Sequence, residues 1–255
     1  MLLENKVALI TGAGRGIGAA IAKSYAENGA IVIVNYLHRS DCANKLVASI
    51  TSFGGRAIAV PCDVRDEVAV KQMVTSIVDN YGTIDVVVNN ALSHYEFDPK
   101  HRKMLGNLIW QDYQSQIDGS VKSIVNVMQA VLPYLKLNQG SHVINLTSDL
   151  VDTPTIPYHD YIVGKSAVIG LNRTMASELG AYGVYVNAIA PGLTYPTDSS
   201  KYTKRDVRED LIAKTPTRRL TTPKDVSGTA VFLASELSSN ITGQCIFVDG
   251  GLHMG

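Results

Sequence analysis

The sequence has little cysteine and no excess of either charge. Its three cysteines, Cys42, Cys62 and Cys245, are scattered over 255 residues without a Cys-x-x-Cys pair. We therefore expect neither a disulfide framework nor a zinc site, and a reducing cytoplasm fits this composition best. The 23 basic residues balance 23 acidic ones. Nucleic-acid and acidic-membrane partners, which require a basic excess, are therefore not expected.

Long hydrophobic runs are also missing. No apolar stretch reaches the roughly 18 residues that suggest a membrane span. The N-terminal segment carries Glu4 and only a short apolar run, which argues against a secretory signal. The six histidines show no metal-ligand spacing, so we expect no metal. With 45% hydrophobic residues, the chain is long enough to form one substantial core, and we expect a single domain over residues 1–255.

Short apolar runs alternate with longer amphipathic stretches. The predicted strands are 7–10, 31–35, 57–61, 84–89, 142–146, 184–189 and 245–248. The predicted helices are 18–28, 41–52, 67–81, 109–137, 158–180 and 223–235. Continuous β-branched runs are typical of a parallel sheet that is buried on both faces. The order of the elements therefore predicts an α/β fold, a single doubly wound Rossmann-type domain with about seven parallel strands.

Two stretches, 93–107 and 192–217, are predicted to be irregular. Each follows a predicted strand, so both should lie at the carboxyl edge of the sheet. Ligands bind at this edge in open α/β sheets.

A glycine-rich turn follows the first predicted strand and opens the first predicted helix. It reads Thr-Gly-Ala-Gly-Arg-Gly-Ile-Gly from Thr11 to Gly18. Glycines allow the backbone to approach a pyrophosphate closely, and the helix N-terminus presents free N–H groups to the anion. The placement between a strand and a helix makes a dinucleotide site the better interpretation than a turn without a ligand.

The end of the second predicted strand indicates which dinucleotide binds. NAD-binding sites usually carry an acid there for the ribose 2′-hydroxyl, but this segment reads Asn35-Tyr36-Leu37-His38-Arg39-Ser40. Arg15, Arg39 and Ser40 could instead bind a 2′-phosphate. We therefore expect NADPH/NADP⁺, the alternative being that both arginines are solvated surface residues.

Tyr161 and Lys165 form a Tyr-x-x-x-Lys pair on a predicted helix, where positions i and i+4 share one face. A lysine ammonium there favours the tyrosinate, so we expect the pKa of the phenol to fall from about 10 toward the working pH. Ser148 follows the strand 142–146, and its hydroxyl could hydrogen-bond the oxygen of a substrate carbonyl.

With these motifs the chain resembles the short-chain dehydrogenase/reductase family over nearly its whole length, and most closely the 3-oxoacyl-[acyl-carrier-protein] reductases. The matching residues are Thr11, Gly12, Gly16 and Gly18, Asp63-Val64, Asn89-Asn90-Ala91, Ser148, Tyr161 and Lys165, Asn187 with Pro191-Gly192, Thr242-Gly243-Gln244, and Val248-Asp249-Gly250-Gly251. Two positions depart from the family pattern. Leu92 replaces a glycine, and Ser120 stands where an asparagine often completes a proton relay, so that relay could be incomplete or could run through an extra water.

The resemblance implies that Tyr161 donates a proton to a carbonyl oxygen, that Ser148 polarises the carbonyl, and that Lys165 binds the nicotinamide ribose, with Ser120 as a further catalytic position. It also implies a homo-oligomer, expected to be a tetramer. The cofactor is expected to bind at Gly12, Gly14, Arg15, Gly16, Ile17, Gly18, Tyr36, Arg39, Ser40, Asp63, Val64, Asn90, Ala91, Tyr161, Lys165, Pro191, Gly192 and Thr197, with Thr194 as the alternative to Thr197.

The substrate is less well defined than the reaction. A carbonyl or acyl thioester, carried on acyl carrier protein, is the first hypothesis, and the basic run Lys100–Lys103 could dock such an acidic carrier. Another small carbonyl or alcohol is the second hypothesis. A non-catalytic NADP-binding sensor is the third, although a pure binder would not need Ser148, Tyr161 and Lys165.

Overall fold

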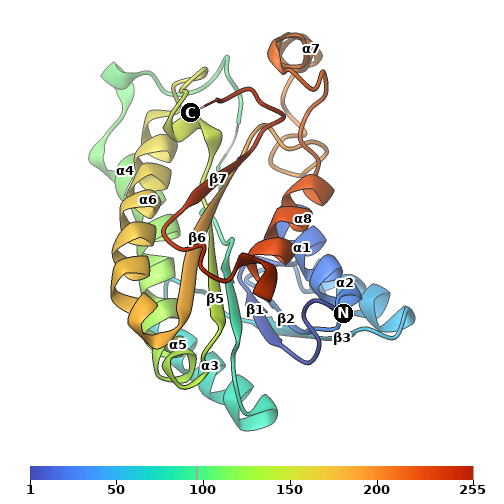
Figure 1. Ribbon diagram of the computed structural model, residues 1–255. Coiled ribbons are helices and arrows are strands. Elements are labelled where there is room, and N and C mark those ends of the chain that lie inside the picture. Colours follow the sequence, from blue (N-terminus) through green and yellow to red (C-terminus); the bar gives the residue numbers. More distant parts are fainter. Residues whose placement is uncertain (96, 255) are drawn as a thin grey trace.

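The computed structural model describes residues 1–95 and 97–254 and contains one parallel sheet with helices on both faces (Figure 1). The seven strands are arranged in the order β3-β2-β1-β4-β5-β6-β7. Their bounds are β1 (Val7–Ile10), β2 (Ile31–Tyr36), β3 (Arg56–Pro61), β4 (Val86–Asn89), β5 (Ser141–Leu146), β6 (Val184–Pro191) and β7 (Cys245–Val248). The predicted α/β class, the parallel sheet and its strand positions are therefore confirmed.

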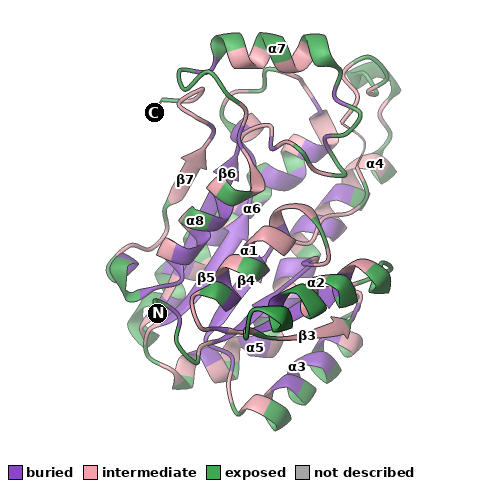
Figure 2. Cartoon of the chain, turned by 90° about the vertical axis from the view of Figure 1, so that its right-hand side faces the viewer, coloured by how far each residue is buried: buried purple, intermediate pink, exposed green. Residues whose placement is uncertain are grey.

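The helices form two layers and one outlying element. Their bounds are α1 (Gly16–Glu27), α2 (Ser40–Ser52), α3 (Glu67–Tyr81), α4 (Trp110–Ile117), α5 (Ser123–Leu137), α6 (His159–Leu179), α7 (Arg205–Lys214) and α8 (Pro223–Leu233). Helices α1, α2 and α8 cover one face, and α3 to α6 cover the other (Figure 1). Helix α7 lies apart, beyond the carboxyl edge of the sheet (Figure 2).

Strand β1 shows why the strands read as continuous apolar runs. Successive side chains point to opposite faces, so Ala8 and Ile10 enter one hydrophobic core while Val7 and Leu9 enter the other. Both faces are covered by helices, and Figure 2 shows the central strands buried. Every position of such a strand therefore favours an apolar residue.

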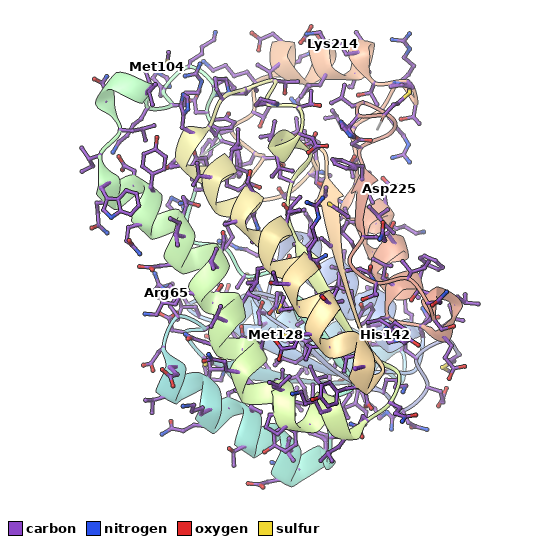
Figure 3. All side chains as sticks on the ribbon, turned by 60° about the vertical axis from the view of Figure 1, so that its left-hand side comes forward. Arg65, Met104, Met128, His142, Lys214 and Asp225 are labelled. Carbon is purple, nitrogen blue, oxygen red and sulfur yellow. The ribbon has the colours of Figure 1, made fainter. Side chains whose placement is uncertain are left out.

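Two predictions about local structure were wrong. The stretch 109–137 is not one regular helix, because a π-helical segment, Asp118–Lys122, separates α4 from α5. The stretch 192–217 is not wholly irregular, because it contains α7. All ten residues of α7 are at least partly exposed, and its apolar stripe is short, with Val207 and Leu211 one turn apart, so it does not stand out in the sequence. Ion pairs one turn apart support it instead, including that between Asp210 and Lys214 at 2.7 Å. Figure 3 labels Lys214, the last residue of α7.

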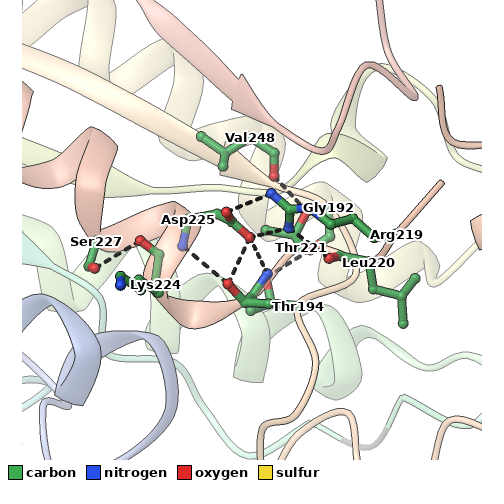
Figure 4. Close-up of polar contacts among 10 residues, drawn as sticks. Gly192, Thr194, Arg219, Leu220, Thr221, Lys224, Asp225, Ser227 and Val248 are labelled. Atoms are coloured by element: carbon green, nitrogen blue, oxygen red, sulfur yellow. Dashed lines mark hydrogen bonds and ion pairs between the residues drawn. The ribbon is translucent and has the colours of Figure 1, made fainter. Parts of the chain in front are cut away.

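The segment that follows β6 is fastened to the sheet where α8 begins (Figure 4). Asp225 accepts hydrogen bonds from the backbone N–H and hydroxyl of Thr222 in a capping box and pairs with Arg219 at 2.6 Å. The Thr221 hydroxyl donates to the Val248 carbonyl of β7 at 3.0 Å. The residues between β6 and α8 are therefore held over the carboxyl edge of the sheet.

Within the described residues, no helix is long and apolar enough to cross a membrane, and no cluster of three or more His, Cys, Asp or Glu side chains could hold a metal ion.

Candidate active site

The glycine-rich turn connects β1 to α1 and depends on glycine at two positions. Gly12 and Gly16 have φ angles of 61° and 58°, in the left-handed region that side chains disfavour. A Cβ atom on Gly12 would also lie 3.0 Å from the Cα atom of Ala91. The turn is therefore pressed against the residues that follow β4.

Two buried or half-buried asparagines hold the turn in place. The Asn35 side chain accepts a hydrogen bond from the Gly12 N–H at 3.1 Å. The Asn90 side chain donates to the Thr11 and Gly12 carbonyls at 2.9 and 3.1 Å. A Cβ atom on Gly18 would lie 2.5 Å from that Asn90 amide nitrogen. Gly18 thus acts by leaving room for Asn90.

A cavity of about 750 Å³ opens at the carboxyl edge of the sheet and brings most of the predicted site together. Of the predicted residues, the cavity is lined by Gly12, Gly14, Arg15, Gly16, Ile17, Tyr36, Arg39, Asp63, Val64, Asn90, Ala91, Ser148, Tyr161, Lys165, Pro191, Gly192, Thr194 and Thr197. Leu92, which replaces the family's glycine, lines it too. Gly18, Ser40 and Ser120 lie outside the lining.

The residues present fit a dinucleotide. The cavity extends from the turn to Tyr161 and Lys165, and both Thr194 and Thr197 face it. Arg15, the residue just before α1, makes no side-chain capping hydrogen bond among the described residues, and the first turn of α1 carries no acid. The N-terminus of α1 therefore offers its backbone N–H groups and its positive dipole end to a pyrophosphate.

The three predicted catalytic residues converge from two elements. Ser148 follows β5, while Tyr161 and Lys165 lie one turn apart on α6, and all three are buried at the cavity wall. The Lys165 ammonium donates to the Leu146 carbonyl at 2.7 Å. This bond fastens the lysine to the end of β5, next to the serine.

The expected fall in the pKa of Tyr161 was wrong for this structure. Burial raises the pKa of Tyr161, which is only 7% exposed, and the Ser148 hydroxyl opposes that rise. Burial also lowers the pKa of Lys165 to about 8. Because burial, together with the charge of Asp149, raises the pKa of the phenol, Tyr161 is protonated at neutral pH, which is the form that a proton donor needs.

Asp149 is a buried carboxyl group that the sequence analysis missed. It follows Ser148 directly and lines the cavity, and the Ser148 hydroxyl donates to its Oδ1 at 3.2 Å. Burial raises the pKa of Asp149 to about 6; the Ser148 bond opposes this rise and the charge of Asp249 adds to it. Asp249 approaches only in the folded chain, so no local signal could have marked this pair.

Asp149→Asn is expected to make the protein more stable at pH 8 by about 2–3 kcal/mol. A carboxyl group whose pKa is raised on folding stabilises the protein below pH 4 and loses that contribution as the pH rises through 6. Denaturant unfolding from pH 4 to 8 measures the difference between wild type and variant. The variant must be compared with the wild type because burial also lowers the pKa of His142 to about 4. That shift makes the free energy of unfolding rise with pH between about 4 and 6.5, opposite to the effect of Asp149. A difference independent of pH would contradict this prediction.

Aromatic rings surround Tyr161 at the wall of the cavity. Tyr95 and Phe97 lie 5.2 and 5.0 Å from its ring centroid, and both rings also contact Tyr158. The Tyr95 hydroxyl donates to Asp160 at 2.8 Å, which fixes this loop against α6. Val207 and Leu211 of α7 add apolar side chains to the lining of the cavity.

Ser120 lies in the π-helical segment between α4 and α5. It is buried, and its hydroxyl has no hydrogen-bond partner among the described residues. Its backbone carbonyl accepts from the Ser123 hydroxyl at 3.1 Å. The catalytic role expected of Ser120 stays a prediction.

The fold and the site define a dinucleotide-dependent oxidoreductase, and comparisons with known proteins agree. Residues 12–253 match the family described as enoyl-(acyl carrier protein) reductase. The 3-oxoacyl-[acyl-carrier-protein] reductase FabG of Staphylococcus epidermidis is 35% identical over 98% of this chain and 100% of its own length. The FabG protein of Thermotoga maritima is 33% identical over 99% of both chains.

Solved structures show the same family likeness. A short-chain dehydrogenase of Burkholderia cenocepacia in complex with NADP is 29% identical, with a TM-score of 0.88 over 99% of both chains. A dehydrogenase/reductase of Sinorhizobium meliloti is 30% identical, with a TM-score of 0.90 over 99% of this chain and 96% of its own. The chain belongs to the short-chain dehydrogenase/reductase family.

Proposed function

We propose that this protein reduces a carbonyl group to an alcohol with NADPH. The observation that carries the proposal is the meeting of Ser148, Tyr161 and Lys165 in the cavity that begins at the glycine-rich turn. A bound nicotinamide supplies the hydride. The chain supplies the proton and the position of the reacting groups.

Each of the three residues has a separate task in the proposed mechanism. The Tyr161 phenol, kept protonated by burial, donates its proton to the carbonyl oxygen. The Ser148 hydroxyl hydrogen-bonds the same oxygen and orients it. The Lys165 ammonium, fixed by the Leu146 carbonyl, binds the nicotinamide ribose and favours the tyrosinate that forms after proton donation.

A 3-oxoacyl thioester, presented on acyl carrier protein, is the proposed substrate. The named activity of the FabG relatives supports it. The apolar side chains of Val207 and Leu211, which line the cavity, also suit an acyl chain. NADPH oxidation is measured with the acyl-carrier thioester, a small thioester of the same acid and a simple ketone. We expect the highest kcat/KM with the carrier thioester. Turnover of only the ketone would favour the second candidate, a small carbonyl, and no turnover would favour the NADP-binding sensor.

NADPH is expected to bind more tightly than NADH, because no acid ends β2 and Arg15 and Arg39 line the cavity there. Arg39→Ala should weaken NADPH by about 1–3 kcal/mol, the typical loss of a charge-assisted hydrogen bond, and should barely change NADH. Fluorescence titration of both cofactors measures this. Equal affinity of the wild type for the two cofactors would refute the NADPH assignment.

We also propose that the chain forms a homotetramer in the cytoplasm. The assembly rests on the family resemblance, and the location is supported by three free cysteines. Light scattering that shows a monomer at micromolar concentration would refute the tetramer. Cell fractionation that places the protein outside the cytoplasm would refute the location.

A further inference from the structure

The segment after β6 reaches back to the glycine-rich turn through an ion pair. Arg15 Nη1 and Asp198 Oδ2 are 2.7 Å apart and join residues 183 positions apart in the chain. The methyl group and Cβ of Thr197 lie about 4.0 and 3.9 Å from where a Cβ atom on Gly16 would be. Asp198 therefore lies over the turn, at the rim of the cavity that it helps to line.

Asp198 lies among the positive charges assigned above to the 2′-phosphate. The Arg15 hydrogen bond and charge lower the pKa of Asp198, and the charges of Lys201 and Arg39 act in the same direction. Arg39 is itself paired with Asp41, at 3.1 Å from Nε to Oδ1. Asp198 thus occupies the position of an anion bound by Arg15.

We propose that Asp198 is a cofactor-specificity residue that competes with the 2′-phosphate for Arg15. A phosphate that takes the Arg15 guanidinium must displace this carboxylate, and it is also repelled by it. A cofactor with a free 2′-hydroxyl leaves the ion pair in place and brings no 2′-phosphate to be repelled, while the pyrophosphate is common to both cofactors. Asp198 therefore makes the preference for NADPH over NADH smaller than it would be with Arg15 unpaired. Because Asp198 belongs to the segment after β6, binding of the 2′-phosphate also acts on the position of that segment. This inference rests on the proposed role of Arg15.

The expected effect is modest because the ion pair is half exposed, with side-chain exposures of 53% for Arg15 and 49% for Asp198. Exposed ion pairs contribute little in water. Removing both the competition and the repulsion should tighten NADPH about three- to tenfold at low salt. The gain should shrink at high salt, because the Debye length falls from about 30 Å at 0.01 M to about 3 Å at 1 M.

The test measures dissociation constants of NADPH and NADH for Asp198→Asn by fluorescence titration at low and high salt. We expect tighter NADPH, unchanged NADH and a smaller difference at high salt. Asp210→Asn is the matched control, because Asp210 is a carboxylate of similar exposure, 58% against 49% for Asp198, that pairs with Lys214 on α7 and does not line the cavity. It should leave both constants unchanged.

Arg15→Ala and the double variant separate the possible failures. If the proposal holds, Arg15→Ala weakens NADPH, and adding Asp198→Asn then gives a smaller gain than it gives in the wild type, because the competition is already gone and only the repulsion is left to remove. Suppose that Arg15→Ala weakens NADPH binding but Asp198→Asn does not tighten it. This result would overturn the proposed competition and leave the role of Arg15 intact. Unchanged NADPH affinity in Arg15→Ala would overturn both. An equal gain for NADH in Asp198→Asn would show a change in the segment itself and would also overturn the proposal.

Discussion

Tyr161→Phe is expected to lower kcat by about 10²–10⁴-fold, the usual contribution of general acid catalysis, and to leave NADPH affinity nearly unchanged. Phenylalanine keeps the ring that contacts Tyr95 and Phe97 but has no proton to donate. Single-turnover reduction and cofactor titration of the same preparation measure the two quantities.

Tyr185→Phe is the matched control for this variant. Tyr185 lies in β6, where its ring contacts His142, and it is not among the lining residues of the cavity. Its hydroxyl can be removed without touching the site, so activity should persist. If Tyr161→Phe kept most of the wild-type activity, another group would have to supply the proton.

Lys165→Met is expected to reduce both turnover and cofactor affinity, with a loss of kcat/KM for NADPH of at least about 10²-fold. The ammonium has two proposed partners, the tyrosinate and the ribose, and methionine serves neither. The Leu146 carbonyl also loses its buried donor, which costs about 1–3 kcal/mol of stability. Thermal unfolding must therefore show that the assayed variant is folded.

The pH profile distinguishes a catalytic lysine from a merely structural one. The pKa of Lys165 is about 8, so its ammonium is charged at pH 7 and is lost above pH 8. In the wild type, kcat/KM for NADPH should fall as the pH rises through 8, because this parameter reports the free enzyme. The fall should be missing in Lys165→Met. A wild-type profile that is flat through pH 8 would count against the proposed charge on Lys165.

The features that the sequence predicted depend on neighbours along the chain. Strand β1 was predicted with its observed bounds because burial on both faces selects apolar residues at successive positions. Tyr161 and Lys165 could be paired because helical geometry alone brings residues four apart together. The glycine-rich turn was recognisable because its conformation requires glycine at Gly12 and Gly16.

Other features depend on contacts between residues far apart in the chain, and the sequence did not predict them. Asp198 reaches Arg15 only because β6 lies in the same sheet as β1, with β4 and β5 between them, so that both carboxyl ends meet at one edge. Helix α7 became visible only in the fold, because its mostly polar residues leave only a short apolar pattern.

The sequence by itself determined the α/β fold, the dinucleotide turn and the identity of the three catalytic candidates, since all of these follow from local spacing and from apolar runs. Only the tertiary structure decided the protonation of Tyr161 and Lys165, and only it brought the buried Asp149 to the cavity. Burial raises the pKa of Tyr161 and of Asp149 and lowers that of Lys165. Desolvation depends on every element that surrounds a group, and those elements come from distant parts of the chain.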